Sequence, residues 1–273
     1  MFTSIRRPGS LRLLAAVGAT LIGLAVGSDG WAGSDSAKKH ETWNWSGTLA
    51  PGRTLEINGV NGKIEAVQSE GDKVEVVAEK YAKRSDPAEV KIEVVQDSDG
   101  ITICAVYPGK GNSCKPGESH SNTKDNDVSV DFTVKVPAGV TFSANTVNGA
   151  IHTEALSGPI RARTVNGSCE IETAQSGEAS TVNGSVKATI GKLSAKDKLD
   201  FQTVNGSITL HLPDAFDAEL DGSTVNGSIE TDFPMTVSGK WGPRSVHGTI
   251  GRGGAQLNAS TVNGSIRLKK NSL

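Results

Sequence analysis

Hydrophobic and polar residues alternate along most of this chain with the period of two that β-strands require. Near the middle of the chain the alternation breaks in a regular way. The apolar face before the break is formed by Leu199, Phe201 and Thr203, and the face after it by Ile208, Leu210 and Leu212. Within each set the step is two, whereas the step between the sets is five. The chain must therefore turn at Asn205-Gly206 if both sets are to face one core.

The break belongs to a motif that recurs eight times. The copies are Val60-Asn61-Gly62, Val147-Asn148-Gly149, Val165-Asn166-Gly167, Val182-Asn183-Gly184, Val204-Asn205-Gly206, Val225-Asn226-Gly227, Val246-His247-Gly248 and Val262-Asn263-Gly264. From Asn148 onward they are spaced by 18, 17, 22, 21, 21 and 16 residues, and Thr commonly precedes and Ser follows them. Repeats of this length are typical of solenoid and array architectures.

Two geometries satisfy this pattern. Asn and Gly tolerate positive φ, so Asn-Gly could form a type I′ hairpin turn and build an antiparallel meander or sandwich. Alternatively, Asn-Gly is a corner between successive strands of a β-solenoid, with the corners stacked one above another. The near-identity of the corners favours stacking, because aligned Asn, Thr and Val side chains support each other as ladders. At His247 we expect a polar residue tolerated at an exposed corner, with ligand binding as the alternative.

Residues 33–137 differ in their sequence pattern from residues 138–273. Strand-like runs of Val or Ile alternating with charged residues predict a half-buried sheet that continues into the repeats. Residues 85–89 predict a short helical turn, and residues 108–127 a loop rich in Gly, Ser, Asn and Lys. Trp43 and Trp45 share a face of an extended strand, where they would cover the open end of the stack or stack on sugar rings.

The three cysteines allow predictions about disulfide bonding and packing. Cys104 and Cys114 flank the start of the loop and are ten residues apart, which allows a disulfide in an oxidising compartment. Cys169 occupies a position filled by Ile or Val in other repeats, so it is expected to pack inward and to be inert.

The first 32 residues read as a cleaved signal peptide. Three Arg side chains precede an uncharged run from Leu13 to Gly27, and Ala32 offers a small residue for cleavage. No later stretch is apolar enough to span a bilayer, so the mature chain is expected in the periplasm or outside the cell. Removing residues 1–32 leaves 25 basic and 29 acidic side chains, a formal charge of −4. This balance argues against binding to nucleic acid, which requires clustered Lys and Arg.

The sequence carries no pattern typical of a catalytic or cofactor site. The five His and three Cys residues show no metal-ligand spacing, and no nucleophile elbow or phosphate-binding loop is present. Carboxylate pairs that cleave polysaccharides are assembled in space, so a pair among Glu154, Glu170, Glu172 and Glu230 is the enzymatic alternative.

In combination, three motifs resemble those of a bacterial putative-adhesin family of β-strand-repeat domains of unknown function. They are the recurrent Thr-Val-Asn-Gly-Ser-Ile, the entry segment from Trp45 to Ile57, and the closing segment from Ser223 to Gly251. The likeness runs over roughly residues 43–270. It implies a right-handed, mainly parallel β-helix-like fold in an envelope or secreted protein, with no catalytic residues to carry over. The loop that bears Cys114 departs from the family pattern.

From these observations we expect an all-β solenoid with an N-terminal β cap region, acting as a non-catalytic, adhesin-like binding or structural element of the cell envelope. Its partner would be an envelope polysaccharide or protein, no cofactor is expected, and a homo-oligomer is possible through exposed terminal coils. The alternatives are a polysaccharide-active enzyme and an envelope assembly or stress accessory protein that uses the loop at residues 108–127.

Overall fold

The computed structural model describes residues 39–117, 123–237 and 244–271. The expected signal peptide at residues 1–32 and part of the loop at residues 108–127 lie outside these ranges. The described part of the chain is all-β apart from one 3₁₀ turn, η1 (Pro87–Glu89), whose first N–H groups are capped by the side chain of Asp86. The helical turn predicted at residues 85–89 is therefore confirmed.

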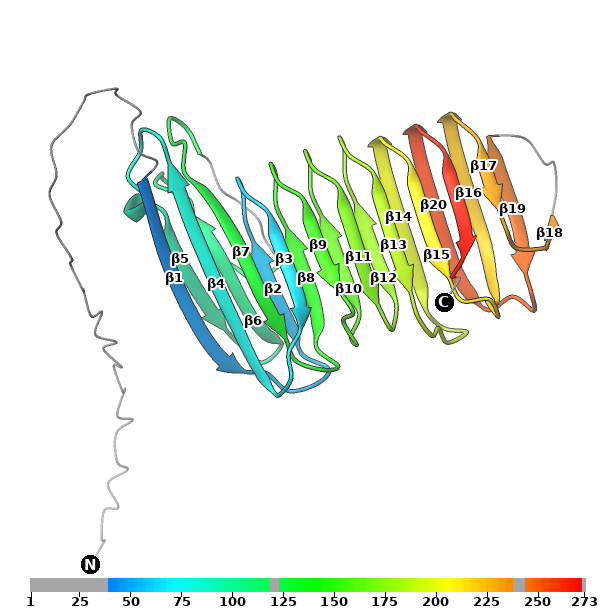
Figure 1. The fold of residues 1–273 in the computed structure, drawn as a ribbon, viewed down its shortest axis with the longest axis horizontal. Coiled ribbons are helices and arrows are strands. Elements are labelled where there is room, and N and C mark those ends of the chain that lie inside the picture. The colour runs from blue at the N-terminus through cyan, green and yellow to red at the C-terminus, as the bar shows by residue number, and fades with distance from the viewer. Residues whose placement is uncertain (1–38, 118–122, 238–243, 272–273) are drawn as a thin grey trace, which may run out of the picture. The chain divides into compact units, whose positions relative to one another are not determined.

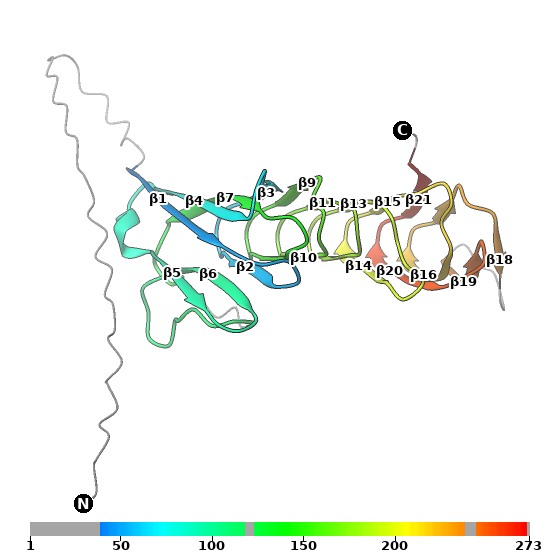
Figure 2. The same ribbon diagram turned by 90° about the horizontal axis from the view of Figure 1, so that it is seen from below.

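The strands form two open mixed sheets that face each other (Figure 1 and Figure 2). Sheet A contains, in spatial order, β1 (Lys39–Thr48), β4 (Lys73–Ala82), β7 (Ser129–Val136), β3 (Ile64–Gln68), β9 (Ile151–Glu154), β11 (Cys169–Thr173), β13 (Val186–Ile190), β15 (Ile208–Leu212), β21 (Ile266–Lys270) and β17 (Ile229–Thr231). Sheet B contains β18 (Met235–Val237), β19 (Ser245–Ile250), β16 (Ala218–Asn226), β20 (Ala255–Asn263), β14 (Lys198–Asn205), β12 (Gly177–Ser180), β10 (Ile160–Arg163), β8 (Thr141–Asn145), β2 (Thr54–Asn58), β6 (Gly100–Val106) and β5 (Lys91–Gln96).

Each Val-Asn-Gly corner joins a strand of sheet B to a strand of sheet A. β14 leads into the corner at Asn205 and β15 leaves it, and each pairs in parallel with the equivalent strand of a neighbouring repeat. The two strands around a corner therefore belong to different sheets, which excludes the hairpin meander. The repeats form a solenoid-like stack of coils, as the identical corners predicted, while its right-handed sense stays a prediction.

The coils do not all stack in the order of the sequence. The coil of β20 and β21 lies between the coil of β14 and β15 and the coil of β16 and β17, with parallel pairing on both sides. Beyond β16, sheet B ends in two antiparallel strands, β19 and β18. The final repeat in the sequence is thus an internal coil of the stack.

At the other end of the stack, strands outside the regular repeats extend both sheets. β2 and β3 stack directly on β8 and β9, although residues paired between them, such as Asn58 and Asn145, are 87 apart in the sequence. The intervening segment adds β7 and β4 to sheet A and β6 and β5 to sheet B. β1, which precedes β2 in the chain, pairs with β4 and forms the edge of sheet A. Trp43 and Trp45 lie on the edge strand β1, half-buried against the core.

The core is the layer between the two sheets. Alternate side chains of each strand point into it, and the largest fully buried ones include Phe132, Phe142, Phe201 and Tyr107. The free thiol of Cys169 is fully buried in this layer, in line with an inward packing role. Over the described residues, no helix has the length and apolar character needed to cross a bilayer.

Candidate functional site

The repeat corners form a continuous edge along the stack, and each residue of the motif has its own neighbour in the next coil. The Thr that begins the motif is buried, and its hydroxyl donates to the Gly carbonyl of the adjacent coil. Thr164 donates to Gly149 at 2.9 Å and Thr203 to Gly184 at 2.8 Å. The same bond recurs at Thr146, Thr181, Thr224 and Thr261. These bonds satisfy carbonyl groups that the corner would otherwise leave buried without a partner.

The Gly of the motif is required for a reason that the sequence did not indicate. At the corners from Gly149 onward, φ lies outside the positive range, so positive φ is the wrong explanation; only Gly62 among the corner glycines adopts it. A Cβ on Gly184 would instead overlap the carbonyl oxygen of Gly167 in the next coil. Corner glycines are therefore the positions where the backbones of neighbouring coils come closest.

The Asn side chains form one unbroken ladder of amide hydrogen bonds. In spatial order the rungs are Asn61, Asn148, Asn166, Asn183, Asn205, Asn263 and Asn226. Each rung after Asn61 donates through Nδ2 to Oδ1 of the preceding rung, at 2.7–2.8 Å. Each amide has two N–H donors, so the ladder leaves one N–H of each donating rung for solvent or a ligand.

A row of exposed valines runs beside this amide ladder. The large hydrophobic side chains that are exposed in the described part of the chain are Val165, Val182, Val204, Val225 and Val262, each 39–53% exposed. We call these valines and the neighbouring exposed Asn rungs the corner stripe. Neighbouring rungs are spaced by about 4.8 Å, the distance between paired strands. The stripe therefore combines regularly spaced methyl groups with amide donors.

At the N-terminal end of the ladder the stripe is covered. Val60 is only 6% exposed and Asn61 is half-buried. Tyr107 packs here, and its hydroxyl donates to the carbonyl of Val128 at 2.8 Å. Burial raises the pKa of Tyr107 to about 12, while hydrogen bonding with Asn61 acts in the opposite direction. The accessible stripe therefore begins at the coil of Asn148.

The copy Val246-His247-Gly248, the seventh of the eight, is not a corner. Val246, His247 and Gly248 lie within β19, whose antiparallel partner β16 places His247 opposite Asp221. Val246 and Gly248 point inward and His247 points outward, as in an ordinary strand. The prediction of a corner at His247 is therefore wrong, because the chain continues straight through this copy.

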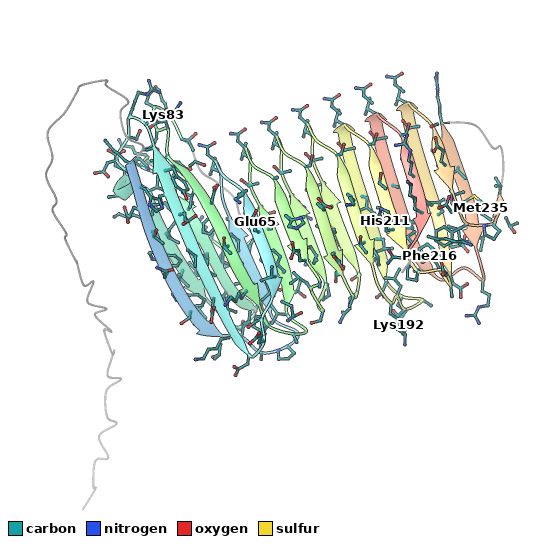
Figure 3. The ribbon with its side chains drawn as sticks, viewed as in Figure 1. Glu65, Lys83, Lys192, His211, Phe216 and Met235 are labelled. Atoms are coloured by element: carbon teal, nitrogen blue, oxygen red, sulfur yellow. A yellow bond between two sulfur atoms is a disulfide. The ribbon has the colours of Figure 1, made fainter. Side chains whose placement is uncertain are left out.

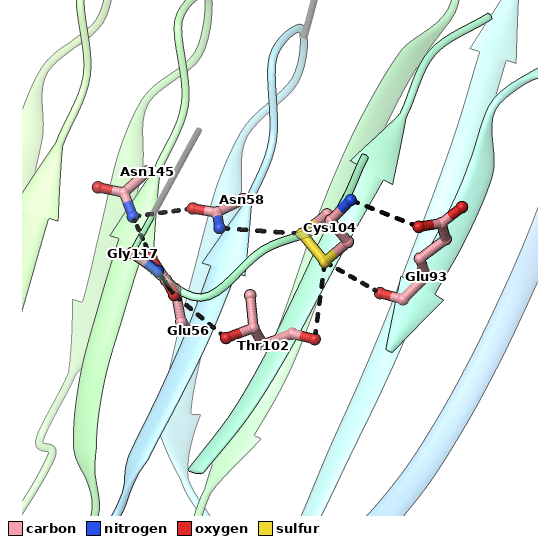
Figure 4. The surroundings of a disulfide bond; sticks show 8 residues. Glu56, Asn58, Glu93, Thr102, Cys104, Gly117 and Asn145 are labelled. Atoms are coloured by element: carbon pink, nitrogen blue, oxygen red, sulfur yellow. Dashed lines mark hydrogen bonds between the residues drawn. A yellow bond between two sulfur atoms is a disulfide. The ribbon is translucent and has the colours of Figure 1, made fainter. Parts of the chain in front are cut away.

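The loop after Tyr107 is fastened to the outer face of sheet B. A disulfide joins Cys104 of β6 to Cys114, with 5.5 Å between their Cα atoms. Nearby, the buried carboxylate of Glu56 accepts hydrogen bonds from the N–H of Gly117 at 2.9 Å and the hydroxyl of Thr102 at 3.2 Å (Figure 4). Asn145 donates to Glu56 and to Asn58, which extends this polar network to the next coil.

The carboxylates considered for catalysis lie in ion pairs or exposed on the outer face of sheet A. Glu170 is paired with Lys187 at 2.6 Å, which holds its pKa below the usual value, and Glu230 lies 3.4 Å from Arg267. Glu154 and Glu172 are exposed on the same outer face of sheet A. Burial raises the pKa of the Cys169 thiol to about 12, so it is no nucleophile at neutral pH. No group of three or more His, Cys, Asp or Glu side chains suited to a metal occurs among the residues described.

The sequence profile named Toastrack DUF4097, a domain of unknown function, matches residues 91–269 of the chain. The chain belongs to this family. All the repeated corners except the one at Asn61 therefore lie within the Toastrack DUF4097 match. No curated protein matches the chain.

The solved structures that match the chain share little sequence with it. A putative cell adhesion protein from Clostridium sporogenes ATCC 15579 is 14% identical, with a TM-score of 0.47, and the match covers 84% of this chain and 100% of that one. A putative adhesin from Bacteroides fragilis NCTC 9343 is 14% identical, with a TM-score of 0.36 and coverage of 84% and 97%. A putative lipid binding protein from Parabacteroides distasonis ATCC 8503 is 12% identical, with a TM-score of 0.24 and coverage of 86% and 95%.

Proposed function

We propose that this protein is an exported, non-catalytic binding element of the bacterial cell envelope, and that the corner stripe is the surface that contacts its partner. The observation that carries the proposal is the row of exposed Val and Asn side chains, repeated in register on successive coils. An extended polymer such as an envelope polysaccharide can contact several rungs at once. Weak contacts at each rung then add to a useful avidity.

Two further features support the assignment. The uncharged leader at residues 13–27 is typical of export, and the disulfide between Cys104 and Cys114 suits an oxidising compartment. The stripe also differs from the flat outer faces of the sheets, which carry mostly charged and hydroxyl side chains. Exposed methyl groups beside amide donors suit a sugar chain, which offers both C–H faces and hydroxyl groups.

The test is a glycan array and an envelope pull-down with the mature chain, Gly33 to Leu273, and two variants. Val165→Lys with Val204→Lys places two charges on the stripe, while Gln202→Lys with Gln256→Lys adds the same charge on the outer face of sheet B. We expect the stripe variant to lose about tenfold or more in affinity for the captured partner, and the control variant to retain it.

Three outcomes would contradict the proposal. Binding that both variants retain, or that both lose equally while staying folded, would place the contact elsewhere on the molecule. Release of shortened sugar products would support the polysaccharide-active enzyme. Absence of any capture would support a purely structural element.

A further inference from the structure

A cleft of about 730 Å³ lies on the outer face of sheet B, beside the disulfide-fastened loop. The lining includes Glu56, Asp99, Ser143, Arg161, Arg163 and Glu178. Residues within 97–100 and residues 116–117 also line the cleft, and Figure 4 shows Gly117 against Glu56. The cleft is separate from the corner stripe, because it opens on the face of the sheet.

The register of the strands sets the order of side chains across the floor of this cleft. Glu56 on β2 lies beside Ser143 on β8, Ser143 lies beside Arg161 on β10, and Arg161 lies beside Glu178 on β12. The small side chain of Ser143 therefore separates the carboxylate of Glu56 from the guanidinium of Arg161. The floor is polar, and its two sides carry opposite charges.

On one side of the cleft, two guanidinium groups share one carboxylate. Nε of Arg161 is 3.6 Å and Nη2 of Arg163 is 3.8 Å from the same oxygen, Oε2 of Glu178. Both distances exceed that of a strong charge-assisted hydrogen bond. Among the residues that line the cleft, two positive charges therefore face one negative charge, and several N–H donors stay available on this side. Asp200, the neighbour of Glu178 on β14, lies outside the lining.

The opposite side carries only negative charge among its lining residues. Asp97 and Asp99 are exposed at the mouth of the cleft, in the turn before β6. Oδ1 of Asp97 accepts the backbone N–H groups of Asp99 and Gly100 at 2.8 Å and 3.0 Å, which fixes the turn in place. Glu56 adds a third carboxylate, but its oxygens already accept bonds from Thr102, Gly117 and Asn145. Asp99 accepts one long hydrogen bond, from the hydroxyl of Ser98 at 3.4 Å, and its other carboxylate oxygen is the one that we assign to the ligand.

We propose that this cleft binds a short extended peptide with both termini charged, its ammonium group facing Asp99 and its carboxylate facing Arg161 and Arg163. Between Asp99 and Arg161 the strand order gives about 14 Å across sheet B, at about 4.8 Å per strand, and the register gives about 10 Å along the strands, so about 17 Å separates their backbones. An extended chain spans about 3.4 Å per residue, so a peptide of about four residues, together with the reach of the two side chains, bridges the two sides. Thr54, Ser143 and Asn145 on the floor offer hydroxyl and amide groups to its backbone.

The proposal is tested by titrating the purified protein with three tetraglycine probes at low ionic strength. The probes are tetraglycine, N-acetyl-tetraglycine, which lacks the ammonium group, and tetraglycine amide, which lacks the carboxylate. We expect tetraglycine to bind about fivefold or more tightly than either blocked peptide, and the difference to shrink as salt is added. Equal binding of all three probes, or no binding of any, would overturn the proposal.

Two variants test the binding of the two ends of the peptide separately. Arg161→Gln with Arg163→Gln should remove the preference for tetraglycine over its amide, whereas Asp99→Asn should remove the preference over the acetylated peptide. Arg267→Gln, on the outer face of sheet A, is the matched control and should change neither. A carboxylate probe without an amine, glucuronate, that binds as tightly as tetraglycine and is unaffected by Asp99→Asn would identify an anion site instead. The corner-stripe variant Val165→Lys with Val204→Lys should leave tetraglycine binding intact, so this test is independent of the proposed function.

Discussion

The two edges of the stack, where the chain passes from one sheet to the other, are built on different principles. At the corner edge, nearly every coil repeats the same residues, and these meet their counterparts in the next coil. At the opposite edge, the connections differ in length and sequence, as at residues 155–159, 174–176, 191–197 and 213–217. Lys192 and Phe216 mark this second edge in Figure 3. From Asn148 to Asn226 the spacing of the corners varies from 17 to 22 residues, and this variation is absorbed on one side of the molecule.

The chemistry of the two edges differs in the same way. Neutral amide and hydroxyl groups hold the corner edge together. The opposite edge is fastened by charge, since Asp217 accepts hydrogen bonds from the backbone N–H of Arg252 at 2.8 Å and from its guanidinium at 2.8 Å and 3.0 Å. It also contains a cavity of about 840 Å³ between loops that do not match each other. Sequence identity between repeats thus marks where neighbouring coils touch closely, and variation marks where they do not.

The largest effect is expected from adding one methyl group at the corner edge. In Gly184→Ala the new Cβ would overlap the carbonyl oxygen of Gly167, and the neighbouring coil cannot move without breaking its ladders. We expect a loss of about 3 kcal/mol in the free energy of unfolding, measured by chemical denaturation.

Gly71→Ala is the matched control, because a Cβ at Gly71 would have no atom within 4 Å. That change should be neutral or stabilise the protein by up to about 0.5 kcal/mol. Similar costs for the two variants would show that glycine is needed at the corners for flexibility and not for close approach.

The corners could be predicted from the sequence because the five-residue step reports on the bend within each coil and the repeated motif on the contacts between neighbouring coils. The position of the last coil could not, because the inward residues Leu257 and Thr261 match those of the preceding coil and fit either neighbour. Gly222 does indicate that its coil has an unusual neighbour. A side chain there would crowd Val246 of the antiparallel strand β19, a contact that the other repeats lack.

A corner at His247 was wrongly predicted because Val246-His247-Gly248 resembles the corner motif. The hydrophobic pattern around it is that of an ordinary strand. Val246, Gly248 and Ile250 are buried at steps of two, without the five-residue step that marks a corner. The cleft on the outer face of sheet B could not be predicted from the sequence. Asp99 and Arg161 come together only through the pairing of β6, β2, β8 and β10. Sites assembled across strands in this way are set by the strand order, which periodicity does not report.

The next largest effect is expected from removing a hydroxyl at the corner edge. In Thr203→Val the carbonyl of Gly184 loses the hydrogen bond that it accepts at 2.8 Å, in a buried position, with little change in side-chain volume. We expect a loss of about 2 kcal/mol in the free energy of unfolding. Thr209→Val, at a half-buried position on β15 outside the corner, should change the stability by no more than about 0.5 kcal/mol.

A smaller effect is expected from breaking the amide ladder at an exposed rung. In Asn183→Asp the donor to Oδ1 of Asn166 is lost, and two acceptors then face each other. We expect a cost of about 1 kcal/mol at pH 7, partly recovered near about pH 3, where a protonated carboxyl can donate. Asn258→Asp, on the exposed face of β20, makes the same chemical change outside the ladder. An equal cost for both substitutions would mean that the ladder adds nothing to stability.

The smallest effect concerns the pH dependence of stability, which should distinguish the charged opposite edge from the neutral corner edge. Hydrogen bonds from the backbone and side chain of Arg252 hold the pKa of Asp217 below the ordinary value of 3.8. Because the folded state favours the carboxylate, its contribution is present above that value and is lost as the pH falls through it. Asp217→Asn should therefore flatten the decline in stability between about pH 5 and about pH 2. Asp214→Asn removes one charge from the same loop as a control. If both variants keep the slope of the unmodified protein, charge does not hold the opposite edge, and its loops depend on packing around Phe216 instead.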